Sequence, residues 1–172
     1  MAEANNSSTR QLVNSSLTPV WHGKYFTLEE MTASPTARRL GIDNTPSAQI
    51  VANLQQLVDN VLDPLRLHWG RPVIVTSGYR CPKLNKAVKG AAQSQHIYGQ
   101  AADIRTVSDD RTENMRLLRT ILDYKLPFDK LIAEYVDDRG RPDWIHVSFS
   151  PLKRGIKLTC IGGRYITGIK IR

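Results

Sequence analysis

The chain has 172 residues, of which 41% are hydrophobic and 23% are charged. This length and composition predict one ordinary folded domain with short extensions, because a chain of this size can bury a sizeable core. No stretch approaches the roughly 20 apolar residues that a membrane-spanning helix needs. Two cysteines are too few for a disulfide-stapled miniprotein or a four-cysteine zinc finger.

Positive charge is concentrated near the carboxyl end. The formal net charge is +8, but segment 152–172 holds six basic residues and no acidic residue. The other 151 residues carry 18 basic and 16 acidic residues, a balance of only +2. We interpret this segment either as an electrostatic tether to an anionic partner, such as nucleic acid, membrane lipid or cell wall, or as a solvated surface without a specific partner.

The first predicted elements in chain order are helices. Thr27 and Glu30 have the spacing of a capping box and predict the start of a short helix. Apolar residues then recur at helical spacing from Ile50 to Leu65, which predicts an amphipathic helix. Pro64 should kink or end that helix, because proline lacks the N–H that the helix needs.

Strands dominate the remainder of the chain. Strands are predicted over 73–76, 101–104, 131–135, 144–149, 156–161 and 164–167, and helices over 83–88 and 112–124. The last two strands flank Gly162-Gly163, a dipeptide typical of a two-residue hairpin. Because these elements lack a regular βαβ rhythm, the sequence favours an α+β fold over a doubly wound parallel sheet.

Two short blocks contain candidate metal ligands. His96 and Asp103 are separated by Gly99 and two alanines, small residues that let the backbone fold back on itself. His146 lies three residues after Asp143. Imidazole nitrogens and carboxylate oxygens bind zinc at about 2.0–2.2 Å. Positions i and i+3 of a strand face opposite sides, so Asp143 must lie in a turn if it is to reach the same metal.

A further candidate is Arg80, which lies in a tight turn after a predicted strand and is held rigidly there. Each candidate also has an ordinary structural interpretation. Asp103 could cap a turn, Asp143 could be a loop acid, and Arg80 could stabilise its turn through an ion pair. Spacing alone therefore leaves both the metal site and these structural roles open.

The candidate residues belong to three sequence blocks in a fixed order. The blocks are Ser77-Gly78-Tyr79-Arg80, then Ser94-x-His96-x-x-Gly99-x-Ala101-x-Asp103, then Asp143-Trp144-x-His146. Together they resemble the zinc D-alanyl-D-alanine carboxypeptidases, one branch of the hedgehog-fold metallopeptidases, which also include phage L-alanyl-D-glutamate endopeptidases. The resemblance covers about residues 26–151. It implies an α+β hedgehog-type fold with a small antiparallel sheet flanked by helices.

The resemblance also implies roles for individual residues. The implied ligands of one Zn²⁺ ion per chain are His96, Asp103 and His146. Asp143 would be the general base. Several relatives carry Glu there, and the shorter acid places this chain nearer the carboxypeptidase-like branch. Arg80 would bind substrate and stabilise the transition state, and Ser94 would support the substrate site.

These roles imply a zinc peptidase that acts on peptidoglycan stem peptides. We expect a D-Ala-D-Ala carboxypeptidase, with an L-Ala-D-Glu endopeptidase of the phage endolysin type as the alternative. A non-catalytic, zinc-containing module that binds the cell wall is a third interpretation. Asp143 and Arg80 speak against it, because a structural zinc would need neither residue.

We expect three segments: a flexible polar leader over 1–20, a zinc peptidase domain over 21–151, and a basic hairpin or tail over 152–172. The leader lacks the apolar stretch of a secretory signal, so we expect synthesis in the cytoplasm and action at the cell wall or in the periplasm after release, as in a bacterial or phage lysis protein. The basic end would contact the anionic wall. A nucleic-acid partner has only charge in its favour and is not expected. Cys81 and Cys160 are expected to be free thiols.

Overall fold

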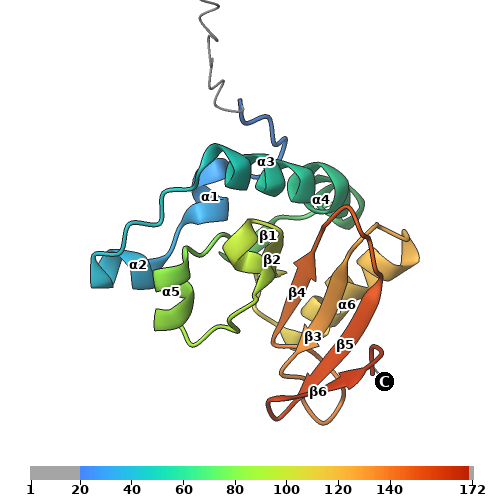
Figure 1. Cartoon of the computed structure of the whole chain (residues 1–172). Coiled ribbons are helices and arrows are strands. Elements are labelled where there is room, and N and C mark those ends of the chain that lie inside the picture. Colours follow the sequence, from blue (N-terminus) through green and yellow to red (C-terminus); the bar gives the residue numbers. More distant parts are fainter. Residues whose placement is uncertain (1–19, 171–172) are drawn as a thin grey trace, which may run out of the picture.

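A computed structural model describes residues 20–170 and shows one sheet with helices around it (Figure 1). The strands are β1 (Val73–Ser77), β2 (Ala101–Thr106), β3 (Lys130–Glu134), β4 (Trp144–Ser148), β5 (Ile156–Ile161) and β6 (Arg164–Thr167). Their order in the sheet is β1-β2-β4-β3-β5-β6, and every neighbouring pair is antiparallel except β3 and β5. The predicted α+β class is confirmed. The leader predicted over 1–20 lies outside the described residues, apart from Val20.

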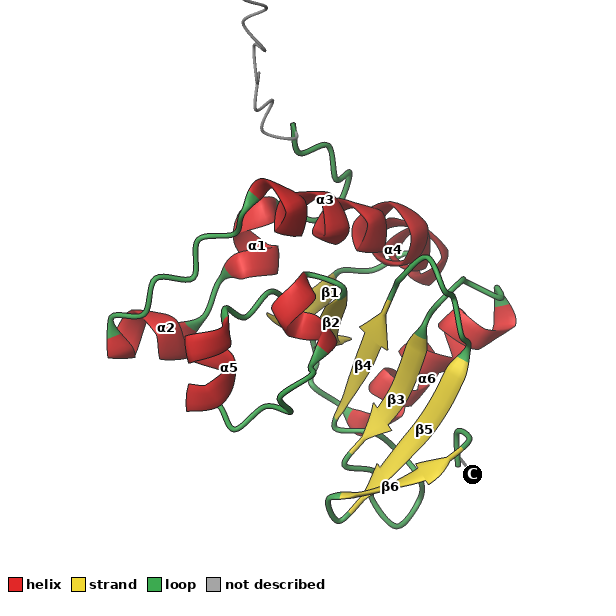
Figure 2. Ribbon diagram, viewed as in Figure 1, coloured by secondary structure: helices red, strands yellow, loops and turns green. Residues whose placement is uncertain are grey.

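Helices cover one face and one end of this sheet (Figure 2). They are α1 (Leu28–Thr32), α2 (Pro35–Leu40), α3 (Ala48–Leu57), the π-helical η1 (Val58–Leu62), α4 (Asp63–Trp69), α5 (Pro82–Ala87), the 3₁₀ helix η2 (Gln95–Tyr98) and α6 (Arg111–Asp123). Figure 2 shows α6 behind the sheet and α3 and α4 across one end. None of the helices in the described part of the chain is long and apolar enough to cross a membrane.

The long amphipathic helix predicted around 50–65 is realised as three consecutive helical segments. The chain remains helical from α3 through η1 into α4, and Pro64 lies in the first turn of α4. A π-helical turn immediately before a proline accommodates the missing N–H and the bulk of its ring. The helix therefore passes through Pro64 with a change of helix type. Its apolar stripe is only partly buried at Ile50 and fully buried at Leu54, Leu57, Leu62 and Leu65.

Two short helices were not predicted. The first is α2, which Pro35 opens with Ser34 as the N-cap, at a position where proline loses no hydrogen bond. The other is η2, which carries His96 and follows the N-cap residue Ser94. By contrast, the capping box predicted at Thr27 and Glu30 is present at the start of α1.

Strand alternation divides the sheet into an apolar face and a polar face. The apolar face packs into the core, with buried Ala102, Ile104, Leu131, Ala133, Ile145 and Val147. On the other face, Asp103 is paired with His146, His146 with Ile132, and Glu134 with Trp144. Paired residues on adjacent strands share a face. The sheet therefore presents acidic and imidazole side chains together on the face opposite its core.

The hairpin predicted at the carboxyl end extends this sheet. β5 runs parallel to β3, and β6 returns antiparallel to β5, with the bounds that the sequence predicted. Gly162 and Gly163 both have positive φ, +54° and +82°, as a tight two-residue hairpin loop requires. Much of the segment expected as a basic tail is thus bonded to the same sheet that carries the candidate ligands.

Candidate metal centre

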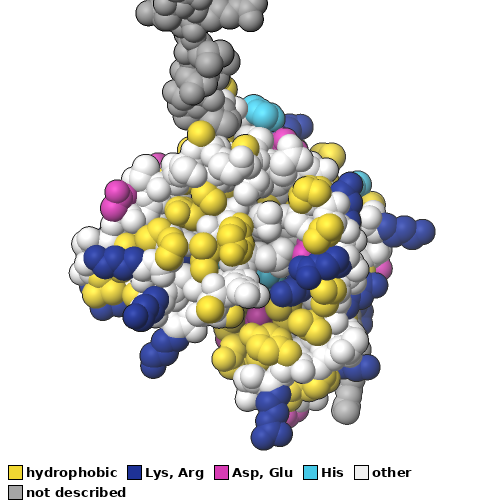
Figure 3. Space-filling view, viewed as in Figure 1, with side chains coloured by type: hydrophobic (Ala, Val, Ile, Leu, Met, Phe, Trp, Pro, Cys, Tyr) yellow, Lys and Arg dark blue, Asp and Glu magenta, His cyan; other side chains and the backbone are white. Residues whose placement is uncertain are grey.

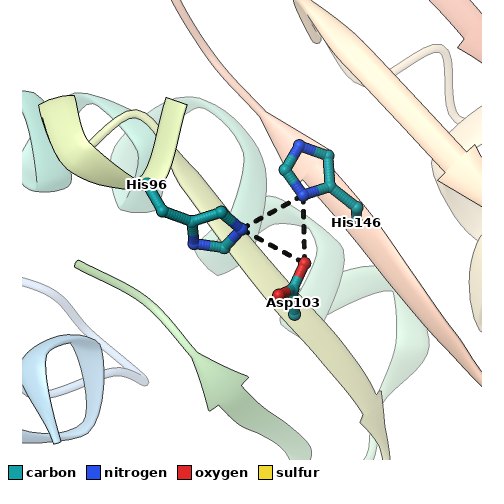
Figure 4. A group of neighbouring side chains, drawn as sticks. All are labelled: His96, Asp103 and His146. Atoms are coloured by element: carbon teal, nitrogen blue, oxygen red, sulfur yellow. Dashed lines mark hydrogen bonds and ion pairs between the residues drawn. The ribbon is translucent and has the colours of Figure 1, made fainter. Parts of the chain in front are cut away.

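Three elements bring the candidate ligands together (Figure 4). His96 lies on η2, Asp103 on β2 and His146 on β4, and the last two residues are direct cross-strand partners. Gly99 ends η2 with φ +66° and turns the chain into β2. A Cβ on Gly99 would lie 2.9 Å from Ile50, so the turn also requires the absence of a side chain.

The three ligand atoms form a small triangle (Figure 4). His96 Nε2 lies 3.2 Å from His146 Nδ1 and 3.3 Å from Asp103 Oδ1, and His146 Nδ1 lies 3.0 Å from the same Oδ1. Ligand atoms at about 2.0–2.1 Å from a tetrahedral zinc ion lie about 3.3 Å from one another. The donor set and its spacing therefore fit one zinc ion.

A further hydrogen bond fixes the orientation of His96. Its Nδ1 lies 2.7 Å from the carbonyl oxygen of Gly78, so Nδ1 carries the proton and Nε2 keeps its lone pair toward the centre. Gly78 itself packs against α1, where a Cβ would lie 2.1 Å from the Met31 carbonyl oxygen. The turn at 77–80, which the sequence predicted after a strand, thus supports the ring of a candidate ligand.

The local electrostatics favour the ligand forms of these groups. Burial alone would raise the pKa of Asp103, but the adjacent His96 and His146 imidazoles hold it far below its ordinary value. Burial lowers the pKa of His146, because it disfavours the charged imidazolium. The carboxylate is therefore ionised and the His146 ring neutral near pH 7, as metal binding requires.

The three residues of the triangle line a cavity of about 460 Å³. Figure 3 views this face, and histidine and acidic surface is visible near its middle among hydrophobic and basic side chains. Three cations, Arg80, Lys89 and Lys130, line the cavity, together with Ser94. Ser94 caps η2 by accepting a hydrogen bond from the His96 N–H at 3.4 Å. Its hydroxyl thus supports the element that carries His96.

Arg80 faces this cavity without an ion-pair partner in the described part of the chain. Its backbone N–H donates to the His96 carbonyl at 3.2 Å, which ties it to η2. Burial lowers the pKa of its guanidinium, and its Nε is buried without a hydrogen-bond partner among the described residues. These features suit a cation that binds an anionic group from outside the chain.

The structure does not bring Asp143 to the metal centre. Its N–H donates to the Glu134 carbonyl at 2.9 Å, so the backbone already follows the β3–β4 ladder. Asp143 lies at a bend before β4, as the sequence required, but its carboxylate lies 3.2 Å from Arg111 Nη2 and is not among the groups that line the cavity. Its assignment as general base stays a prediction from the resemblance.

Glu134 and Tyr165 line the cavity but were not singled out from the sequence. The Glu134 residue is only 6% exposed, and burial raises the pKa of its carboxyl. The Tyr165 hydroxyl lies 3.4 Å from both of its carboxylate oxygens. The sequence did offer one indication of Glu134, because it is an acid that directly follows the apolar run Leu131–Ala133 of a predicted strand. No local pattern pointed to Tyr165.

An ion pair between Asp129 and Arg154 lies beside η2. Asp129 is fully buried and accepts from Arg154 through two contacts of 2.9 and 2.5 Å. Gln95 donates to the same carboxylate at 2.8 Å and accepts from Ser148 at 2.9 Å. One residue of the basic segment, Arg154, therefore has a defined structural partner.

Cys81 and Cys160 are both free thiols, as the sequence predicted.

A family model described as Peptidase M15 matches residues 24–148. The matched range contains all three sequence blocks and the whole triangle of candidate ligands, and it ends before the β5–β6 hairpin. No curated protein matches the chain.

Proposed function

The chain belongs to the peptidase M15 family, which makes it a zinc-dependent peptidase, and on that premise we propose that it hydrolyses peptidoglycan stem peptides. We assign one zinc ion to His96, Asp103 and His146. The observation that carries this assignment is the convergence of their ligand atoms within 3.0–3.3 Å of one another in the lining of a cavity of about 460 Å³.

The side chains around the cavity have distinct tasks in this proposal. When bound, zinc would polarise the scissile carbonyl and lower the pKa of water. Arg80 would bind negative charge that develops on the carbonyl oxygen, because its guanidinium has unused donors facing the cavity. Ser94 would keep η2, and with it His96, in place.

We further propose D-Ala-D-Ala carboxypeptidase activity as the specific reaction. Such a substrate ends in a free carboxylate beyond the scissile bond, and the cations Arg80, Lys89 and Lys130 line the cavity. Charge-assisted hydrogen bonds from these side chains would hold that carboxylate. An L-Ala-D-Glu endopeptidase would cut inside the stem and would not need the terminal carboxylate.

Defined muropeptides distinguish these activities. The zinc-loaded protein is incubated with a muropeptide that ends in D-Ala-D-Ala, and the products are weighed by mass spectrometry. Loss of a single alanine supports the carboxypeptidase, whereas scission after L-alanine supports the endopeptidase. Activity should disappear with a chelator and return with zinc. Full activity in a demonstrably zinc-free preparation would contradict the proposal.

We propose that the enzyme acts at the cell wall after release and contacts it through the hairpin. Lys157, Arg164 and Lys170 are all exposed on or beside β5 and β6. Reversing these three charges should weaken co-sedimentation with purified sacculi at low salt more than reversing the exposed Arg38, Arg39 and Arg119. Equal effects of the two triple variants would leave the basic segment as an ordinary solvated surface.

A further inference from the structure

Glu134 lies on the cavity side of the sheet together with the candidate ligands, whereas Asp143 does not line the cavity. Glu134 is paired with Trp144 on β4, two residues from His146, and Ile132 is paired with His146. Residues two apart on a strand share a face, so Glu134 is a diagonal neighbour of His146 on the cavity side of the sheet. Both residues line the same cavity as Arg80.

The surroundings of Glu134 leave its carboxylate available. No Lys, Arg or His pairs with it in the described part of the chain. The Tyr165 hydroxyl lies at the long distance of 3.4 Å from each of its oxygens. The titratable groups that face it are His146, Asp103, Tyr165 and Cys160, and burial raises the pKa of its carboxyl.

Asp143 has the opposite environment. Its side chain is 47% exposed and lies against Arg111 of α6 at 3.2 Å. Asp143 lies at a bend just before β4, and it is not among the residues that line the cavity with His146. Its carbonyl also accepts from Asn114 at 2.6 Å, and its N–H donates to Glu134, which fixes the backbone in this orientation.

We propose that Glu134, rather than Asp143, is the general base of the hydrolysis, an inference that rests on the proposed function. Glu134 takes a proton from the attacking water as the water oxygen bonds to the scissile carbonyl carbon. It then gives that proton to the amide nitrogen as the C–N bond breaks. One peptide and one water yield a carboxylic acid and an amine, and the Glu134 carboxylate is regenerated.

The test compares four variants in one muropeptide assay. Glu134→Gln should lower kcat by about 10²–10⁴-fold, the typical contribution of a general base. Glu134→Asp should retain more activity than Glu134→Gln, since it keeps a carboxylate. Asp143→Asn should lose far less than Glu134→Gln. Glu29→Gln, on the exposed side of α1, is the matched control and should keep wild-type kcat.

A second readout is independent of turnover. Zinc affinity is measured by chelator competition on each purified protein with the metal alone. Glu134→Gln should bind zinc within about threefold of wild type, because a base contacts the reacting water and not the ion. A loss of about 10–100-fold would instead make Glu134 a support of the ligands and would overturn the inference.

The outcomes separate this inference from the function on which it rests. If wild type cleaves no muropeptide, or cleaves it without zinc, the proposed function fails. If wild type is an active zinc enzyme and Glu134→Gln keeps its activity, the inference alone fails. A deep loss in Asp143→Asn with an active Glu134→Gln would restore Asp143 as the base.

Discussion

Single glycines determine whether the ligand triangle can form. Gly99 turns the chain from η2 into β2, and both its positive φ and the proximity of Ile50 exclude a side chain. The turn lies three residues after His96 and four before Asp103. A small change at this position should therefore affect both the fold and metal binding.

Gly99→Ala should destabilise the protein more than Gly41→Ala. Both glycines are left-handed, which costs an alanine about 1–2 kcal/mol, but a Cβ on Gly41 meets nothing within 4 Å. At Gly99 the contact with Ile50 adds an overpacking cost of about 1–3 kcal/mol. Urea unfolding of the metal-free variants measures the difference, and chelator competition should show weaker zinc binding for Gly99→Ala alone. Equal unfolding free energies would contradict the role of this contact.

The sequence contained enough information to identify the candidate ligands but not the base that we propose. His96, Asp103 and His146 stand in sequence blocks that resemble a known family, and this resemblance implied all three as ligands where their spacing alone left the question open. The resemblance assigned the general base to Asp143, because the family has an acid three residues before its last histidine ligand. Strand alternation already required Asp143 to lie in a turn if it was to reach the same metal. Glu134 reaches the centre only through the pairing of β3 with β4, a contact between segments that local patterns do not predict.

At the scale of elements, the β5–β6 hairpin contributes to the cavity although it lies outside the matched family range. Leu158 and Tyr165 line the cavity, and both belong to the polar face because β5 and β6 continue the register of β3. The sequence predicted this hairpin from its glycine pair. The sequence did not predict where this hairpin joins the sheet. β5 pairs in parallel with β3, and no local sequence pattern indicates a parallel pairing between separated segments.

Tyr165→Phe should shift the pH dependence of the reaction. The hydroxyl of Tyr165 lowers the pKa of Glu134, so its removal should raise that pKa further. The acidic limb of kcat/KM should then move to higher pH, with zinc affinity unchanged. Tyr124→Phe removes an exposed hydroxyl from a ring that stacks on His68 away from the cavity, and it should shift nothing. An unchanged acidic limb in Tyr165→Phe would show that this hydroxyl does not act on the base.

Arg154 should stabilise the fold through Asp129. Hydrogen bonds from Arg154 hold the pKa of Asp129 well below its ordinary value, against the effect of burial. The unfolded chain therefore binds the proton more readily, and this stability is present above about pH 4 and is lost as the pH falls further. Arg154→Met should cost about 2–3 kcal/mol at pH 7, because it leaves a buried carboxylate unpaired.

The measurement is urea unfolding at a series of pH values. The difference between wild type and Arg154→Met should shrink toward acid pH, where Asp129 becomes protonated in both proteins. Lys153→Met, one residue away and without an ion-pair partner among the described residues, is the control. A difference that stays constant with pH would exclude the ion pair as its source.

At the scale of the whole molecule, the two faces of one sheet have different roles. Its apolar face builds the core, and its polar face, with η2 and the turn at 77–80 above it, forms the cavity. The α+β class and most strands could be predicted, because period-2 apolar patterns and turn residues are local signals. Strand order and the faces on which distant residues meet are set by tertiary packing. Strand order and shared faces could therefore not be predicted from local sequence patterns.

The most direct test of the central assignment is a crystal structure of the zinc-loaded protein with anomalous data collected at the zinc edge. One anomalous peak should lie about 2.0–2.2 Å from His96 Nε2, His146 Nδ1 and Asp103 Oδ1 together. A protein that takes up no zinc, or a peak bound by other side chains, would contradict the assignment.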